Sequence, residues 1–257
     1  MNILRSIVMA FCMFSRIPMP IVEWKNENMR YMLCAFPLVG AVIGVVLWLW
    51  QLLSAALGFG PLLWAAGLTL LPVAVTGGIH MDGFCDVSDA LASHAPAEKK
   101  RAILKDSHTG AFAIITLGCY LLLYAALASE MPVTGRSALL LGLMHVLSRI
   151  LSGTISLVYP KSDAEGLLRT FTLSAEGKGP LAVLLVLLVL CAGALVFAGG
   201  FVGAAMVLGG VLTALWMKRL SAKQFGGMSG DLSGYFLQMA ELIMLLCCVI
   251  ISKVVQL

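Results

Sequence analysis

Hydrophobic residues occur in this chain in runs too long for the strands or amphipathic helices of a water-soluble protein. Residues 31–81 include no Asp, Glu, Lys or Arg, and four later stretches are nearly uncharged. A helix needs about 20 apolar residues to cross a bilayer, and Pro61 and Gly199-Gly200 divide the two longest runs. The pattern predicts an all-α, polytopic integral membrane bundle that forms one domain over 1–257. Seven spans are expected, near 33–57, 61–79, 111–129, 137–158, 181–198, 201–217 and 235–254.

The first apolar run, from Ile3 to Met13, is too short to cross a bilayer. No small-residue cleavage site follows it, so a signal peptide is not expected. An interfacial or re-entrant helix that ends at Pro18 and Pro20 fits this stretch better.

Charged residues make up 12% of the chain, against about 25% in a typical soluble protein. If the N-terminus is cytoplasmic, 14 of the 17 Lys and Arg residues fall in inner segments, as the positive-inside rule requires. The net charge of +4 therefore indicates orientation in a lipid bilayer, and no nucleic-acid partner is predicted. The inner segments are 1–32, 80–110, 159–180 and 218–234.

Three aspartates follow the first long apolar run: Asp82, Asp86 and Asp89. A helix through this segment would place them on one face, at positions i, i+4 and i+7. Ionised pairs about 6 Å apart repel by roughly 2 to 3 kcal/mol at an effective dielectric of 20. We therefore expect a cation here, namely Mg²⁺, and through it a phosphate-bearing substrate. His80 is a candidate metal ligand or proton carrier, or only a hydrogen-bonded polar residue.

Two further polar motifs fall on the same predicted side. The first is 105–111, with Lys105 and Asp106, and the second is 226–231, which is rich in glycine and ends in Asp231. If packing brings the three motifs together, carboxylates would hold the metal while cations and backbone N–H groups bind phosphate oxygens. The competing interpretation is that Asp106 and Asp231 cap the helices that follow, with the glycines in an ordinary loop.

Two charged residues lie inside predicted spans. Arg149 is about twelve residues into the fourth span and Glu241 six residues into the seventh. An arginine at that depth is costly unless it pairs or faces a polar cavity. A role in the site is favoured over snorkelling for Arg149, and less strongly for Glu241. Arg16 cannot be interpreted from its own surroundings.

Several of these motifs together resemble the membrane-bound cobalamin synthases, or adenosylcobinamide-GDP ribazoletransferases. The resemblance runs nearly end to end, and its specific parts are the His-x-Asp-Gly-x2-Asp-x2-Asp string and the final Gly-Gly-x-Ser-Gly-Asp. His108 departs from the family, which commonly has Arg there. The matching segments are 15–18, 36–40 with Gly44, 77–83 with Asp86 and Asp89, 105–107 with Gly110, 148–149, and 226–231 with Glu241.

The resemblance implies an enzyme of cobalamin nucleotide-loop assembly in a bacterial or archaeal cell membrane (the inner membrane in Gram-negative cells). It would transfer the phosphocobinamide group of adenosylcobinamide-GDP to α-ribazole, or to its 5′-phosphate, and release GMP with Mg²⁺ as cofactor. Its active site would be cytoplasmic. Homo-oligomers, or association with other nucleotide-loop assembly enzymes, are left open.

The roles that follow are hypotheses. A carboxylate, Asp106 or Asp89, accepts the hydroxyl proton. The predicted catalytic residues are Asp82, Asp89, Asp106 and His80. The predicted metal ligands are Asp82, Asp86, Asp89 and Asp231. The predicted substrate-binding residues are Arg16, Lys105, Arg149, Gly227 and Gly230.

Two alternative functions are weighed against this one. A CDP-alcohol phosphotransferase is also multi-span and Asp-rich, but its usual string stops matching after Asp82-Gly83, where Asp86-Val87 replaces Ala-Arg. A cation-coupled transporter usually carries its carboxylates near the bilayer midplane, in a repeated architecture. The acidic residues here lie at the predicted membrane edge and no internal repeat is evident.

Overall fold

A computed structural model describes residues 3–106, 108–162, 166–175 and 177–255. Within these ranges the chain forms twelve helices, and its one β feature is an isolated parallel bridge between Lys161 and Met228. The helices are α1 (Ile3–Phe14), α2 (Asn26–Met29), α3 (Met32–Leu57), α4 (Pro61–Thr76), α5 (Ile79–Ala92), α6 (Ala97–Ile103), α7 (Ala111–Ser129), α8 (Gly135–Val158), α9 (Leu167–Ser174), α10 (Lys178–Gly199), α11 (Phe201–Phe225) and α12 (Gly230–Val255).

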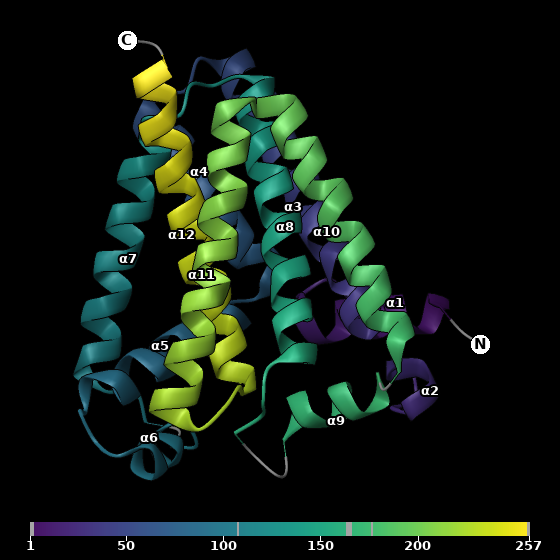
Figure 1. Cartoon of the computed structure of the whole chain (residues 1–257). Coiled ribbons are helices and arrows are strands. Elements are labelled where there is room, and N and C mark those ends of the chain that lie inside the picture. The colour runs from purple at the N-terminus through teal and green to yellow at the C-terminus, as the bar shows by residue number, and fades with distance from the viewer. Residues whose placement is uncertain (1–2, 107, 163–165, 176, 256–257) are drawn as a thin grey trace.

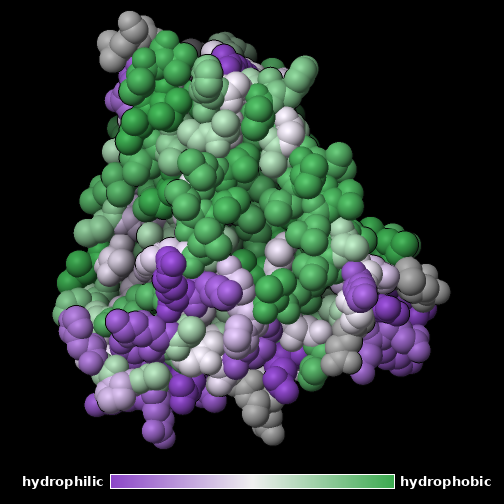
Figure 2. All heavy atoms as spheres, viewed as in Figure 1, coloured by the Kyte–Doolittle hydropathy of each residue, from purple (hydrophilic) through white to green (hydrophobic). Residues whose placement is uncertain are grey.

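The long helices run roughly side by side between two ends of the molecule (Figure 1). The short helices α5, α6 and α9 lie at one end, and the C-terminus lies at the other. Figure 2 shows hydrophobic side chains over the middle of this face and hydrophilic side chains gathered at the end that carries the short helices. We call this end of the molecule the polar end.

Six helices are long and apolar enough to span a membrane: α3, α7, α8, α10, α11 and α12. A seventh span arises if α4 and α5 are counted as one bent pair. The all-α membrane bundle predicted from the sequence is therefore confirmed.

The predicted span 61–79 differs in detail from the structure. Helix α4 ends at Thr76 because Gly77 and Gly78 both adopt left-handed backbone angles, with φ of +69° and +82°, which glycine adopts without steric penalty. Helix α5 then leaves at 98° to α4. The chain thus returns to the polar end through α4 and turns there, so that α5 lies across the bundle (Figure 1).

The most buried of the spanning helices is α8, which packs against α3, α10, α11 and α12. Its crossing with α3 is close because glycines meet there. A Cβ added at Gly44 would lie 3.0 Å from the Cα of Gly142, and one at Gly40 would lie 2.5 Å from the carbonyl oxygen of His145. Small residues spaced four apart are typical of tightly packed membrane helices.

Helix α1 packs against α3 and buries Ser6, Met9 and Ala10. At 12 residues it is about 18 Å long, too short to cross a bilayer, as predicted. It ends at Phe14, four residues before the predicted stop at Pro18. The backbone N–H of Arg16 then donates to the carbonyl of Val75 at 2.8 Å, which ties this segment to the end of α4.

Candidate active site

Helix α5 carries the three aspartates that were predicted to share a face. Phe84 and Val87 anchor the helix in the core, whereas Asp82 is exposed and Asp86 is half-buried. The prediction that this segment is helical is confirmed. The amphipathic pattern therefore places carboxylates along the outer side of a helix at the polar end.

Two glycines allow α5 and α12 to cross with their backbones almost in contact. A Cβ added at Gly83 would lie 2.8 Å from the carbonyl oxygen of Asp231, and one at Gly234 would lie 3.0 Å from that of His80. Because only glycine permits such an approach, the crossing brings Asp231 of α12 next to the aspartates of α5. The first and third polar motifs of the sequence thus meet.

The carboxylates at this crossing influence one another electrostatically. The pKa of Asp86 is raised from 3.8 to about 6. Its partial burial is the largest cause, followed by the negative charge of three neighbours, which are Asp82, Asp231 and Asp89. Binding a proton or a cation relieves the repulsion within such a group of like charges and lowers its free energy. We call Asp82, Asp86 and Asp231 the acidic cluster.

Asp89 connects this helix to the second polar motif. One of its carboxylate oxygens accepts the N–H of Gly110 at 2.5 Å and the other accepts the N–H of Ala113 at 2.8 Å. Asp89 therefore caps the N-terminus of α7, where free amides need acceptors. Asp89 thus holds Gly110 and the first turn of α7 in place. This structural role differs from the predicted roles of metal ligand and proton acceptor.

A cavity of about 260 Å³ opens beside the start of α12. Three cations, Lys105, Lys161 and Arg169, line it together with Gly230 and Asp231. Burial and the charge of Arg169 lower the pKa of Lys161, which indicates that two positive charges lie close together. Cations beside a helix N-terminus form a site for anions such as phosphate. We call it the basic cavity.

Sequence reasoning predicted Lys105 as a phosphate-binding residue, and it missed Lys161 and Arg169, which line the same cavity. Both belong to the segment 159–180, whose positive charges were used only to orient the protein. The isolated bridge of Lys161 to Met228 carries the 159–162 segment to the glycine-rich motif, and this pairing of distant segments has no local sequence signal.

The glycines of the third motif have different roles. Gly226 ends α11 in a left-handed conformation, and a Cβ at Gly227 would lie 2.5 Å from the carbonyl carbon of Lys161. Gly227 therefore makes room for the segment that carries Lys161, whereas Gly230 lines the basic cavity itself. The hydroxyl of Ser229 accepts the N–H of Leu232 at 3.3 Å, so Ser229 supplies a side-chain cap at the start of α12.

Asp106 lies on the exposed connection between α6 and α7. Its Oδ1 accepts the N–H of His108 at 3.0 Å and lies 2.7 Å from Nδ1 of the same residue. These hydrogen bonds lower the pKa of Asp106. Its competing interpretation as a cap of α7 is wrong for the described residues, because Asp89 has that position. Its predicted role as proton acceptor stays a prediction.

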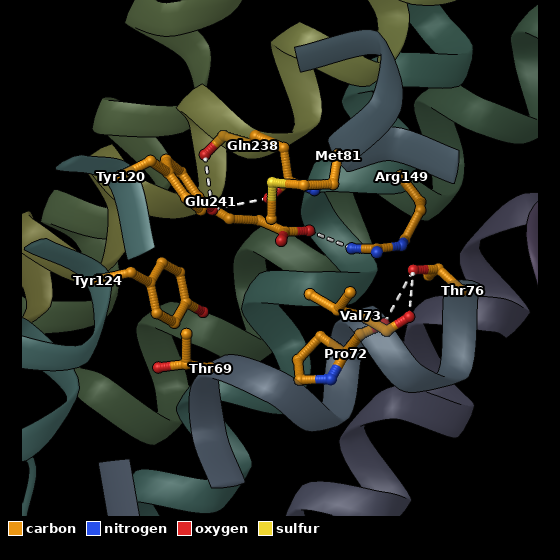
Figure 3. Close-up of a pocket in the computed structure, with 10 residues that line it drawn as sticks. All are labelled: Thr69, Pro72, Val73, Thr76, Met81, Tyr120, Tyr124, Arg149, Gln238 and Glu241. Carbon is orange, nitrogen blue, oxygen red and sulfur yellow. Dashed lines mark hydrogen bonds and ion pairs between the residues drawn. The ribbon is translucent and has the colours of Figure 1, made fainter. Parts of the chain in front are cut away.

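Arg149 lies apart from the acidic cluster, inside the bundle. It is 1% exposed and pairs with Glu241 of α12, while Ser148 donates to the same carboxylate at 2.8 Å. Figure 3 shows this ion pair beside Tyr120, whose hydroxyl bonds Gln238 at 2.7 Å. The small cavity lined by these groups, about 20 Å³, has room for about one water. Arg149 therefore neither snorkels nor lines the basic cavity.

His80 lies between these two regions. Its ring is 5.5 Å from that of Phe36 and 6.2 Å from that of Phe14. Burial, followed by the charge of Arg149, lowers its pKa to about 3, so the imidazole is neutral. Its Nε2 is buried and has no hydrogen-bond partner among the described residues.

Arg16 is exposed and lies against the corner between α4 and α5. A Cβ added at Gly77 would be 3.3 Å from the Cβ of Arg16. Arg16 is not among the residues that line the basic cavity, so its predicted phosphate contact stays a prediction.

The acidic cluster suits Mg²⁺ by its chemistry, because its donors are hard carboxylate oxygens whose mutual repulsion a cation relieves. Among the described residues, however, no three His, Cys, Asp or Glu side chains are already arranged to hold a metal ion. Mg²⁺ is commonly bound by one or two carboxylates together with substrate phosphates and waters. The residues therefore fit an ion that binds together with a phosphate substrate.

Comparison with known proteins also finds enzymes named for a phosphate-bearing substrate. Curated relatives named adenosylcobinamide-GDP ribazoletransferase match nearly the whole chain. The one from Lachnoclostridium phytofermentans is 40% identical over 260 residues, which cover 99% of this chain and 97% of the relative. One from Brevibacillus brevis is 34% identical, with coverage of 93% and 96%, and one from Clostridium botulinum is 30% identical, with coverage of 94% and 96%.

No solved structure matches this chain. The profile of the family described as cobalamin-5-phosphate synthase matches residues 6–249, a range that includes the acidic cluster and the basic cavity. The chain therefore belongs to the cobalamin-5-phosphate synthase family.

Proposed function

We propose that this protein transfers the phosphocobinamide group of adenosylcobinamide-GDP to α-ribazole, or to its 5′-phosphate, and releases GMP. The names of its relatives support the reaction. The observation that carries it is the position of Asp231, which lines the basic cavity and also contributes to the raised pKa of Asp86. Anion-binding and acidic groups therefore adjoin one another, as the transfer of a diphosphate group requires.

The basic cavity is the proposed site of the diphosphate. Lys105, Lys161 and Arg169 neutralise its oxygens, and the first amides of α12 add the positive end of the helix dipole. Positioning and charge neutralisation supply most of the catalysis in phosphoryl transfer. These groups lower the cost of the charge that develops as GMP leaves.

The acidic cluster is the proposed site of Mg²⁺, held by Asp82, Asp86 and Asp231. When bound, the ion would supply charge neutralisation at the diphosphate. A ribose hydroxyl of the acceptor forms a bond to the phosphorus next to cobinamide, the bond from that phosphorus to the oxygen of GMP breaks, and a carboxylate takes the hydroxyl proton. Asp106 is the proposed acceptor, because both oxygens of Asp89 already accept backbone N–H groups.

Turnover of the purified protein tests this function. With adenosylcobinamide-GDP, α-ribazole and Mg²⁺, GMP and a complete corrinoid should form, and Asp82→Ala and Asp86→Ala should each abolish GMP release. A matched control is Glu130→Gln, an exposed carboxylate that pairs with Lys253 at 2.7 Å, away from the cluster. Near-normal turnover of either aspartate variant at saturating Mg²⁺ would contradict these assignments.

Two further assays separate the alternatives. Release of CMP from a CDP-alcohol would favour the phospholipid reaction, and uptake into sealed vesicles without release of GMP would favour transport. Membership of the cobalamin-5-phosphate synthase family speaks against both. Association with a second copy, or with other enzymes of nucleotide-loop assembly, stays a prediction.

We further propose that the polar end faces the cytoplasm of a bacterial or archaeal cell. Fourteen of the 17 Lys and Arg residues belong to the four inner segments, and the excess of positive charge on the inner side sets the orientation of most membrane proteins. The active site would then be supplied from the cytoplasm.

A further inference from the structure

A second cavity adjoins the acidic cluster on a side that the proposed diphosphate site does not use. It measures about 240 Å³ and shares Leu167, Leu168, Gly230 and Asp231 with the basic cavity. Six helices supply its walls: α1, α3, α5, α8, α9 and α12. We call it the aromatic cavity.

Rings dominate one part of the aromatic cavity. Phe14, Phe36, His80 and Phe171 all line it, and the centroids of Phe14 and Phe36 are 4.1 Å apart. Aromatic side chains bind flat rings by stacking and by edge contacts. The volume lies below the usual range of about 300–1,000 Å³ for ligand pockets. It therefore suits one small ring system and excludes a macrocycle such as a corrin.

Polar groups also line the cavity, and one of them, His80, has an unpaired ring nitrogen among the described residues. Ser152, Ser156 and Ser233 line the cavity, and the hydroxyls of Ser156 and Ser233 lie 3.2 Å apart. His80 is 5% exposed, and its Nε2 is buried without a partner among the described residues. Polar groups enclosed in apolar surroundings lower their free energy when a ligand supplies hydrogen bonds.

The charges of the two cavities are complementary to different ligands. Three cations line the basic cavity. The described residues that line the aromatic cavity include no Lys or Arg, and they include Asp82 and Asp231. The aromatic cavity therefore offers no cationic side chain among its described lining residues to hold a diphosphate, whereas its carboxylates can accept hydrogen bonds from a neutral ring that carries hydroxyl groups.

We propose that the aromatic cavity binds the acceptor nucleoside, with its heterocyclic base among the rings and its ribose toward Asp82 and Asp231. This inference rests on the proposed function and names where the second substrate binds. The acceptor hydroxyl then meets the diphosphate at the boundary of the two cavities, which is formed by the residues that line both of them. Phe14 and Ser152 are proposed to determine the affinity for the base.

Steady-state kinetics of purified protein test this assignment through two variants. Ser152→Leu places a larger side chain in the cavity from α8. Phe14→Leu removes one aromatic ring from the cavity wall, at a position that is only half-buried. Phe14→Leu should raise KM for α-ribazole about three- to tenfold, the value of one aromatic contact, and Ser152→Leu should raise it further. KM for adenosylcobinamide-GDP should change less than twofold in both.

The reciprocal variant is Arg169→Gln in the basic cavity, which should raise KM for adenosylcobinamide-GDP and leave KM for α-ribazole nearly unchanged. Leu122→Ala, at a side chain that is 74% exposed on α7, is the neutral control. An unchanged KM for α-ribazole in both cavity variants would overturn the assignment, as would an equal rise of both KM values.

Equilibrium binding separates this inference from the proposed function. Calorimetry of α-ribazole with the protein in nanodiscs should give a heat of binding that Ser152→Leu weakens at least tenfold, whether or not turnover occurs. If wild-type protein binds α-ribazole but releases no GMP, the proposed reaction fails and the cavity assignment stands. If Ser152→Leu instead removes a co-purified lipid and leaves the Kd for α-ribazole unchanged, the cavity binds an acyl chain and the assignment is wrong.

Discussion

At the scale of single residues, Asp86 is a proposed metal ligand with a raised pKa. Its pKa near 6 lies above the unfolded value of 3.8, so the folded protein binds more protons than the unfolded chain between these two pH values. Stability from this group is therefore present at low pH and is lost as pH rises toward 6. Without a cation, the acidic cluster destabilises the fold at neutral pH.

We predict that metal-free protein in detergent has a higher melting temperature at pH 5 than at pH 7, and that Mg²⁺ raises it mainly at pH 7. Mg²⁺ affinity, measured by calorimetry, should increase as pH rises through about 6, because the ion must displace the proton of Asp86. Asp86→Asn should remove most of both effects. An affinity independent of pH between 5 and 7 would contradict the role of Asp86.

The ion pair of Arg149 with Glu241 makes a second residue-scale prediction. Both side chains are at least 97% buried, so replacing one of them leaves an unpaired charge inside the bundle. Glu241→Leu should destabilise the protein by about 3–5 kcal/mol. The double variant Arg149→Met with Glu241→Leu should recover most of this loss, because neither charge of the pair is then left without its partner.

Thermal unfolding of the single and double variants measures this coupling. If Arg149 instead binds substrate phosphate, the double variant would be stable but would lose affinity for adenosylcobinamide-GDP. The KM of the double variant for that substrate therefore distinguishes a structural pair from a binding residue.

At the scale of elements, the crossing of α5 with α12 places the acidic cluster. Ala at position 83 would put a Cβ 2.8 Å from the backbone of Asp231, so α5 must shift. Gly83→Ala should lower turnover by about 100-fold, the cost of a displacement near 1 Å. Gly118→Ala is the matched control, because a Cβ there meets nothing within 4 Å and alanine favours the helix.

Both variants are compared by turnover and by melting temperature. Gly118→Ala should keep full activity with equal or higher stability. Full activity of Gly83→Ala would show that the close approach of α5 to α12 does not matter for the reaction.

At the scale of the whole molecule, the path of the chain predicts opposite locations for its two ends. Seven crossings, with α4 as the second, put the N-terminus at the polar end and the C-terminus at the other (Figure 1). A periplasmic reporter enzyme fused after the C-terminus should be active, and one fused within the 93–96 connection should be inactive. An inactive C-terminal fusion would mean that α4 does not cross.

Much of this architecture could be predicted because it depends on local sequence. Apolar runs define the spans, and the spacing of Asp82, Asp86 and Asp89 defines one helix face. The partner of Arg149 and the placement of Lys161 could not be predicted, because each depends on which helices pack together. Asp89 shows the same limit, since a capping carboxylate and a metal-binding carboxylate look alike until the neighbouring backbone is placed.

The 98° corner at Gly77-Gly78 affects how water-soluble molecules reach the acidic cluster. Since α5 lies flat across the end of the bundle, water-soluble molecules reach its carboxylates without entering the hydrocarbon layer. The lipid bilayer then serves to anchor the protein. It confines the protein to a plane, while its substrates arrive from the water beside that plane.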